Sequence, residues 1–178
     1  MLASRSRLLF TILAIAIAIG LPTSVGATQA VGTQNAQFTD GWYKLRYVID
    51  GDTIRVQGLE RDVRLAGIDA AESYEPYGPR ATATLKWLLT QGQYPGWVYL
   101  EVATPSYDNY YGRYRAHVWF SAPNWGNGWV LTQGYLALTG LATVDSGYYA
   151  SDLYYDYLAW MESYAQSRNC GIWGGQSC

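Results

Sequence analysis

Residues 48–56, VIDGDTIRV, divide a strand-like run into two halves. Ile49, Ile54 and Val56 favour extended backbone, whereas an Asp-Gly-Asp junction between them favours a tight turn. Strand-like runs at about 44–50, 52–57 and 62–68 are separated by DG and GLE turns. The sequence therefore predicts a three-strand meander. A hairpin alone does not require the second aspartate, Asp52.

A helix and two further strands are predicted after the meander. The helix starts at Pro79, which suits a first helical turn, and ends before Gly92. Its apolar residues recur at helical spacing: Ala81, Leu85, Leu88 and Leu89. Strands are expected at 97–102 and 114–120, joined by a polar loop at 104–113.

Two more helices are expected toward the C-terminus. The first is short, at 129–135, and the second covers 150–167. In the second helix one face should hold Leu153, Tyr157, Met161 and Tyr164. Five short strands with an interposed helix predict an α+β fold with a mostly β core: a five-stranded OB-type barrel with about three helices. A chain of 178 residues, 49% of them hydrophobic, can bury one such core.

The N-terminus has the pattern of a secretory signal peptide, predicted over residues 1–27. Arg5 and Arg7 precede an apolar run at 8–19, and small residues at 25–27 suit a cleavage site. The run is short for a membrane span, which needs about 18 apolar residues, although an uncleaved anchor is the alternative. Residues 28–42 are interpreted as a flexible lead-in and 43–178 as the folded domain.

Both cysteines, Cys170 and Cys178, lie close to the C-terminus. In an oxidising compartment a disulfide between them would stabilise the fold by roughly 2.5 kcal/mol at best. Two free thiols are the alternative. A zinc site is not expected, because the chain has one histidine and no CxxC spacing.

The charge balance excludes a polycationic binder. Without Arg5 and Arg7 the chain has 10 basic and 14 acidic residues. An anionic ligand must then be held by a few local arginines, because global electrostatic attraction is absent.

Charged residues of the middle third gather in three short motifs: DGDT at 50–53, RLAGIDAAE at 64–72 and YGR at 111–113. YGPRA at 77–81 and GIW at 171–173 accompany them. In these motifs the chain resembles the thermonuclease family, secreted calcium-dependent nucleases of the staphylococcal nuclease type. The resemblance extends over about residues 43–173.

The resemblance implies a calcium site. Asp52 and Asp69 match the family's carboxylate ligands, and the backbone carbonyl of Ala70 matches a further one. Asp50 would lie in the outer shell. Oxygen donors with flexible geometry are what calcium prefers, and a backbone carbonyl tolerates Ala where the family usually has Thr.

The resemblance also implies catalytic residues. Arg64 and Arg113 match two catalytic arginines, whose planar guanidinium can donate two charge-assisted hydrogen bonds to a phosphate. Glu72 matches the candidate general base. Tyr111 matches a residue that contacts the substrate phosphate through its hydroxyl. Any one of these taken alone would be read as a solvated surface residue.

The expected function is that of a secreted nuclease that hydrolyses DNA and RNA with Ca²⁺, prefers single strands and leaves 3′-phosphate ends. We expect a monomer without stable membrane association after signal-peptide cleavage. The alternative is a non-catalytic secreted OB-type module that binds nucleic acid or polysaccharide. The 17 Tyr and 8 Trp residues could stack on bases or serve in packing. Lysines are rare on the expected substrate face, where Tyr110 precedes YGR.

Overall fold

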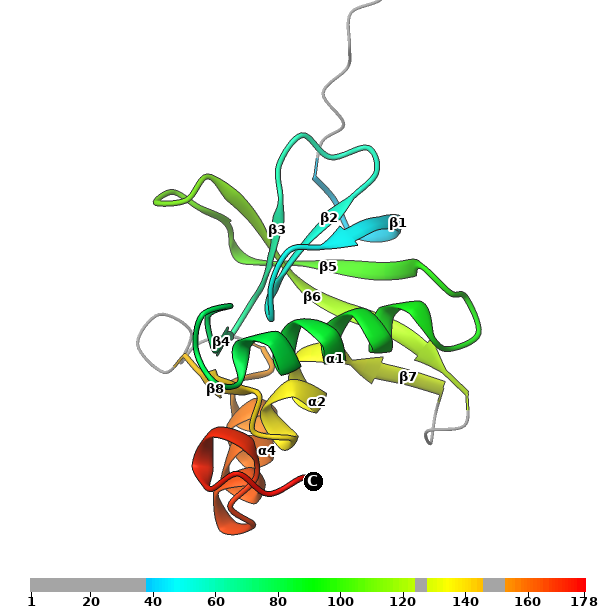
Figure 1. Ribbon diagram of the computed structural model, residues 1–178. Coiled ribbons are helices and arrows are strands. Elements are labelled where there is room, and N and C mark those ends of the chain that lie inside the picture. Colours follow the sequence, from blue (N-terminus) through cyan, green and yellow to red (C-terminus); the bar gives the residue numbers. More distant parts are fainter. Residues whose placement is uncertain (1–37, 124–127, 146–152) are drawn as a thin grey trace, which may run out of the picture. The chain divides into compact units, whose positions relative to one another are not determined.

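Five strands close into a barrel in the computed structural model, and a sixth strand extends the sheet (Figure 1). The strands are β1 (Gly41–Val48), β2 (Thr53–Val56), β3 (Val63–Leu65), β5 (Trp97–Asp108), β6 (Arg113–Ala122) and β7 (Gly128–Leu131). Their order is β3-β2-β1-β5-β6-β7, and neighbours in it are antiparallel. A parallel pairing of β3 with β6 closes the barrel. The predicted five-stranded OB-type barrel is confirmed.

The structure describes residues 38–123, 128–145 and 153–178. The predicted signal peptide and residues 28–37 of the predicted lead-in lie outside the described residues. Phe38 stacks on Tyr114, with 4.6 Å between the ring centroids, and β1 begins at Gly41. Within the described residues, no helix is long and apolar enough to cross a membrane.

The DGD junction is a tight turn between β1 and β2. Gly51 is buried, and a Cβ atom there would lie 2.6 Å from that of Ala70 and 2.8 Å from that of Ala81. A side chain at this position would therefore clash with strand β4 (Ile68–Ala70) and helix α1 (Gly78–Thr90), which pack against the turn. The turn requires glycine because of this close approach.

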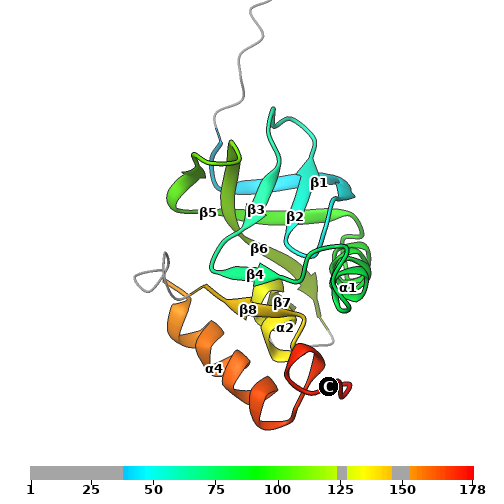
Figure 2. The same cartoon turned by 60° about the vertical axis from the view of Figure 1, so that its left-hand side comes forward.

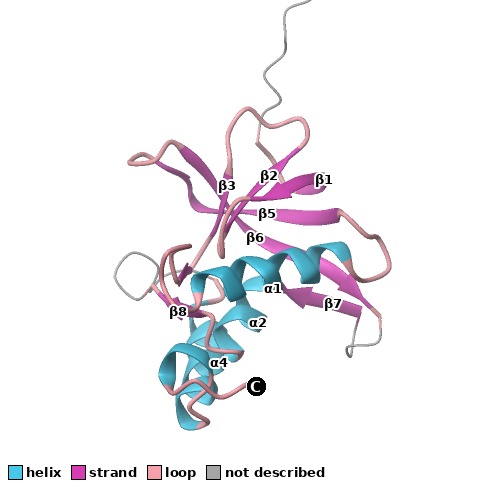
Figure 3. Ribbon diagram, in the orientation of Figure 1, coloured by secondary structure: helices cyan, strands magenta, loops and turns pink. Residues whose placement is uncertain are grey.

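Helices cover one end of the barrel (Figure 3). They are α1 (Gly78–Thr90), α2 (Thr132–Leu138) and α4 (Tyr155–Ser167), followed by the 3₁₀ turn η1 (Gly171–Trp173). The predicted apolar face of α1 is buried. Strands β4 (Ile68–Ala70) and β8 (Ala142–Val144) pair as a separate two-stranded sheet, which lies between the barrel and α4 in Figure 2. Residues 68–70 thus leave the barrel instead of continuing its third strand.

Three local predictions were wrong. Residues 128–131 form β7 because they pair with β6, with Trp129 opposite Ser121, and the helix starts only at Thr132. The polar loop predicted at 104–113 is mostly strand, since β5 reaches Asp108, whose cross-strand partner is Arg113. Tertiary pairing decides strand character in both segments.

The third correction concerns α4. Leu158 and Ala165 are its buried residues, whereas Leu153 is 77% exposed and lies before the helix begins. Leu158 packs in the hydrophobic core. The helix has aromatic residues on several sides, so apolar periodicity alone did not identify the packed face.

Cys170 and Cys178 are joined by a disulfide, with 5.7 Å between their Cα atoms. A backbone bridge between Cys170 and Gln176 closes the same loop. The structure therefore agrees with the disulfide alternative of the sequence analysis.

Gly78→Ala is expected to destabilise the fold. A Cβ atom at Gly78 would lie 1.8 Å from the carbonyl oxygen of Glu72, which is backbone and cannot rotate away. We expect the free energy of unfolding to fall by about 1–3 kcal/mol, measured by urea denaturation. Lys86→Ala, on the exposed side of the same helix, should change it by less than about 0.5 kcal/mol. Equal stabilities of the two variants would contradict this account of Gly78.

Candidate functional site

The guanidinium of Arg64 pairs with two carboxylates beside the DGD turn. Arg64 pairs through Nη1 with Oδ1 of Asp52, and its Nη2 lies 2.5 Å from Oδ1 of Asp69. The Asp52 side chain is 3% exposed and that of Asp69 is 65% exposed. The pairing of Thr53 with Arg64 between β2 and β3 places Arg64 beside the DGD turn. A positive charge is thus held between a buried carboxylate and a solvated one.

Asp52 has hydrogen-bond donors at both carboxylate oxygens. Its Oδ2 accepts the backbone N–H of Ala70 at 2.7 Å, and its Oδ1 accepts the hydroxyl of Thr53 at 3.1 Å. Asp50 accepts the backbone N–H of Asp52 at 3.0 Å, which fixes the turn. These bonds orient the Asp52 carboxylate toward Arg64.

Arg113 is held by Asp108 across the end of the β5–β6 hairpin. Its Nη2 and Nε donate to Oδ2 of Asp108 at 2.8 and 3.2 Å. Its Nη1 donates to the hydroxyl of Thr53 at 3.3 Å, and its Cζ lies 4.5 Å from the ring centroid of Tyr111. Because Thr53 in turn donates to Asp52, a continuous chain of polar contacts joins the two arginines.

A cleft of about 600 Å³ opens beside this chain of contacts. Arg64 and Arg113 both line it, together with the exposed rings of Tyr110 and Tyr111. Two guanidinium groups that face one hollow can bind an anion with several charge-assisted hydrogen bonds. The geometry suits a phosphate group whose oxygens spread between the two arginines.

The pKa of Asp108 lies below its ordinary value of 3.8. Burial acts to raise it, but hydrogen bonds from Arg113 and from the backbone N–H groups of Tyr111 and Tyr110 outweigh burial. The charge of Arg113 lowers it further. Asp108 therefore stays ionised at neutral pH and holds the guanidinium of Arg113 in place.

Asp108→Asn should lower the melting temperature in a pH-dependent way. Because the folded-state pKa is depressed, the stabilisation by the carboxylate is complete above the unfolded pKa and is lost as pH falls through the folded pKa. Thermal melts should show a similar deficit of the variant at about pH 7 and pH 5, and a smaller one at about pH 2.5. A deficit that does not change with pH would contradict this role of the Asp108 charge.

Glu72 is the predicted site residue that the structure does not bring into this network. It is exposed, and its backbone N–H donates to Oε2 of Glu75 at 2.7 Å. Among the described residues no side chain donates to its carboxylate. Its loop follows Asp69 and Ala70 directly, so the carboxylate is tethered near the site without being fixed there. The predicted role of Glu72 stays a prediction.

Sequence reasoning missed Thr53, Asp108, Arg115 and Asp145. Thr53 lies within the DGDT motif and links the two arginines, whereas Arg115 and Asp145 line the cleft. An acidic residue five positions before Arg113 was a usable signal for Asp108, because a hairpin brings such positions opposite each other. Nothing in the local sequence pointed to Asp145, which follows β8 in a distant part of the chain.

The residues predicted to hold calcium supply two carboxylates and one backbone carbonyl, which are oxygen donors of the type that calcium prefers. The described residues contain no cluster of three or more His, Cys, Asp or Glu side chains that could hold a metal. Asp52 and Asp69, however, converge on one guanidinium, so both carboxylates already face a shared positive charge. Two carboxylates supplemented by backbone oxygen and water form the kind of site that binds calcium weakly.

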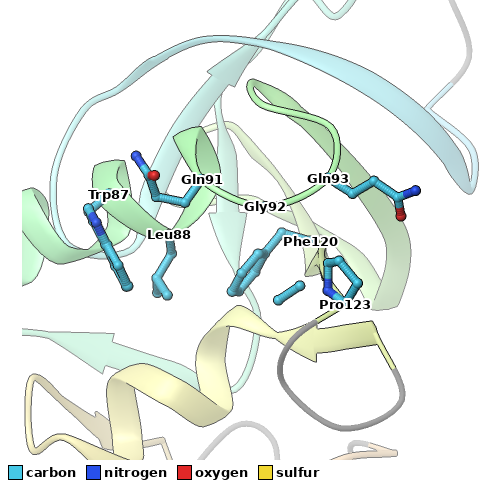
Figure 4. A pocket seen from close by; sticks show the side chains of 8 residues that line it. Trp87, Leu88, Gln91, Gly92, Gln93, Phe120 and Pro123 are labelled. Atoms are coloured by element: carbon cyan, nitrogen blue, oxygen red, sulfur yellow. The ribbon is translucent and has the colours of Figure 1, made fainter.

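Another hollow, of about 420 Å³, lies between the end of α1 and the end of β6 (Figure 4). Trp87, Leu88, Phe120 and Pro123 line it with two glutamines, and no charged side chain of the described residues does so. It offers no group for phosphate chemistry. The cleft beside Arg64 and Arg113 is the candidate site.

Comparison with known families finds one match. The family model described as staphylococcal nuclease homologue matches residues 62–175. This match covers more than half of the chain, and the protein therefore belongs to the staphylococcal nuclease homologue family. No curated protein matches the chain. The predicted family and fold class are confirmed, and membership indicates a nuclease-type function.

Proposed function

We propose that the protein is a secreted calcium-dependent nuclease that hydrolyses phosphodiester bonds of DNA and RNA and leaves 3′-phosphate ends. The observation that carries the proposal is the cleft that Arg64 and Arg113 line together, with Asp52 and Asp69 beside it. A module that only binds nucleic acid does not require a buried carboxylate paired with an arginine at its binding site. The family match supports the same reaction class.

The arginines are proposed to stabilise the charge that builds on phosphate oxygens during in-line attack. Arg113 is oriented for this by Asp108 and by the Tyr111 ring, so it loses little conformational freedom when substrate binds. Arg64 lies on the carboxylate side of the cleft. When phosphate binds, it can exchange its exposed contact with Asp69 for a phosphate oxygen and keep the buried one with Asp52.

Asp52, Asp69 and the Ala70 carbonyl would hold the calcium ion, with Asp50 behind them. When bound, the ion supplies Lewis-acid polarisation of the phosphate and a place for water. Glu72 is proposed to accept a proton from the attacking water, which its exposed loop allows it to reach. Tyr111, which is 67% exposed, can donate its hydroxyl to a phosphate.

Single strands are the proposed preferred substrate. Two tyrosine rings at the hairpin tip, Tyr110 and Tyr111, are exposed beside the cleft, where they can stack on unpaired bases. The excess of acidic over basic residues disfavours long contacts with duplex backbone. Secretion through the N-terminal signal peptide and a monomeric state complete the proposal.

The test is cleavage of single-stranded DNA by the purified protein with calcium, then with a chelator in excess. We expect cleavage that stops on chelation and resumes when calcium is restored, with 3′-phosphate ends on the fragments. Binding of DNA without cleavage under both conditions would assign the alternative, a non-catalytic module. Cleavage that persists in the chelator would contradict the proposed dependence on calcium.

A further inference from the structure

Four aromatic rings line an open hollow at the opposite end of β5 from the candidate site. They are Trp42 on β1, Tyr94 before β5, Trp97 at the start of β5 and Trp129 on β7, and together we call them the aromatic box. The hollow measures about 430 Å³ and is lined by these four residues alone among those described. Each of them is between 41% and 48% exposed. Contiguous exposed aromatic surface of this kind marks binding sites.

Rings of the aromatic box contact one another at steep interplanar angles. The Trp42 centroid lies 5.4 Å from that of Trp129 at an interplanar angle of 52°, and 5.7 Å from that of Tyr94 at 77°. The rings therefore contact one another at an angle and are not stacked in parallel, and each keeps part of its surface exposed. The arrangement suits a rounded ligand of a few heavy atoms.

Two carboxylates stand beside the aromatic box. Asp40 and Glu101 line an adjoining hollow of about 460 Å³ that shares Trp42 and Trp129 with the box. Both accept hydrogen bonds from neutral donors: Asp40 from the backbone N–H of Val102 at 2.7 Å, and Glu101 from the Trp119 indole at 3.0 Å and the Tyr154 hydroxyl at 2.9 Å.

In the described part of the chain, no Lys or Arg forms an ion pair with Asp40 or Glu101, and none lines either hollow. Lys44 lies opposite Trp97 between β1 and β5, but it is not part of the lining. The lining of the two hollows is therefore aromatic and includes two carboxylates.

We propose that the aromatic box binds a small organic cation with N-methyl groups, of the quaternary ammonium class, as a free solute. Its methyl groups would contact the rings, and its charge would be attracted by the ring faces and by Asp40 and Glu101. Nucleic acid is disfavoured because its phosphates would be repelled by these carboxylates, as would the phosphate of a lipid headgroup. The site is separate from the proposed nuclease activity and does not depend on it.

The test is titration of the full-length protein with choline chloride at constant ionic strength, followed by tryptophan fluorescence. The neutral isostere 3,3-dimethyl-1-butanol is the matched probe, because it has the same shape without the charge. We expect saturable binding of choline with a Kd of roughly millimolar order, and at least about tenfold weaker binding of the isostere. Equal affinities, or no saturation by choline, would overturn the proposal.

Substitutions inside and outside the aromatic box test whether choline binds there. Trp129→Ala should weaken choline binding by about tenfold or more, whereas Trp87→Ala, outside the box, should not change it. Asp40→Asn and Glu101→Gln keep a hydrogen-bond acceptor and so preserve the fold while they remove the charge. Each should weaken choline binding several-fold and leave both the isostere and nuclease turnover unaffected. Unchanged choline affinity in both of these variants would refute the role of the carboxylates.

Two further measurements distinguish choline from other ligands of the aromatic box, namely nucleic acid and a membrane surface. Displacement of choline by oligothymidylate would assign the aromatic box to nucleic acid and overturn the proposal. If the protein sedimented with phosphatidylcholine vesicles but did not bind free choline, the aromatic box would be assigned to a membrane surface. That result would overturn the proposal that its ligand is a free solute. Binding of choline that neither competitor affects supports the proposal.

Discussion

Arg113→Ala is expected to lower kcat on single-stranded DNA by about 10³-fold while the protein stays folded. The guanidinium lines the cleft and is held by Asp108, so its removal takes away charge stabilisation of the transition state and no core contact. Loss of a single arginine in phosphoryl transfer costs on the order of 10³–10⁵ in rate. Steady-state kinetics with saturating calcium measure the effect, and thermal melts check the fold.

Two matched variants sharpen this experiment. Arg113→Lys keeps the charge but loses the planar fork, so it should recover only a small part of the lost rate. Arg61→Ala removes an arginine that contacts the same hairpin, through the Gly112 carbonyl at 3.2 Å and the Tyr107 ring, but does not line the cleft. Its kcat should stay within about threefold of the wild type. Turnover like the wild type in Arg113→Ala would remove Arg113 from the mechanism.

Asp52→Asn is expected to abolish both turnover and the stabilisation of the fold by calcium. A ligand that binds only the folded state raises stability by about 2.7 kcal/mol at 100 times its Kd, so calcium should raise the melting temperature of the wild type. Asp52 is buried and paired with Arg64, and its neutral amide would hold a divalent cation poorly. Melting curves across a calcium titration, for variant and wild type, measure the difference.

The variant also loses stability without calcium, because a buried ion pair is broken. The comparison must therefore be the calcium-dependent shift within each protein. Asp62→Asn, which breaks the Arg55–Asp62 ion pair away from the cleft, is the control and should keep the full shift. If Asp52→Asn kept its calcium-dependent shift while it lost turnover, the metal would have to bind elsewhere.

Sequence patterns determined the features that depend on neighbours along the chain. Alternation in the meander, the helical spacing of Leu85 and Leu88, and the DGD turn are local features, and the sequence predicts each of them. The candidate residues Asp52, Arg64 and Asp69 were found by motif spacing, and the structure brings them into contact. Their chemical roles stay predictions.

Tertiary structure alone decided what depends on pairing between distant segments. The parallel contact of β3 with β6 closes the barrel and brings Arg113 beside Thr53, a residue 60 positions earlier. Pairing with β6 also makes residues 128–131 a strand, although the sequence pattern predicted a helix there. The aromatic box likewise joins β1, β5 and β7, whose aromatic residues have no common period in the sequence. Local sequence patterns do not reveal such contacts, because these contacts stabilise the protein only once the barrel has closed.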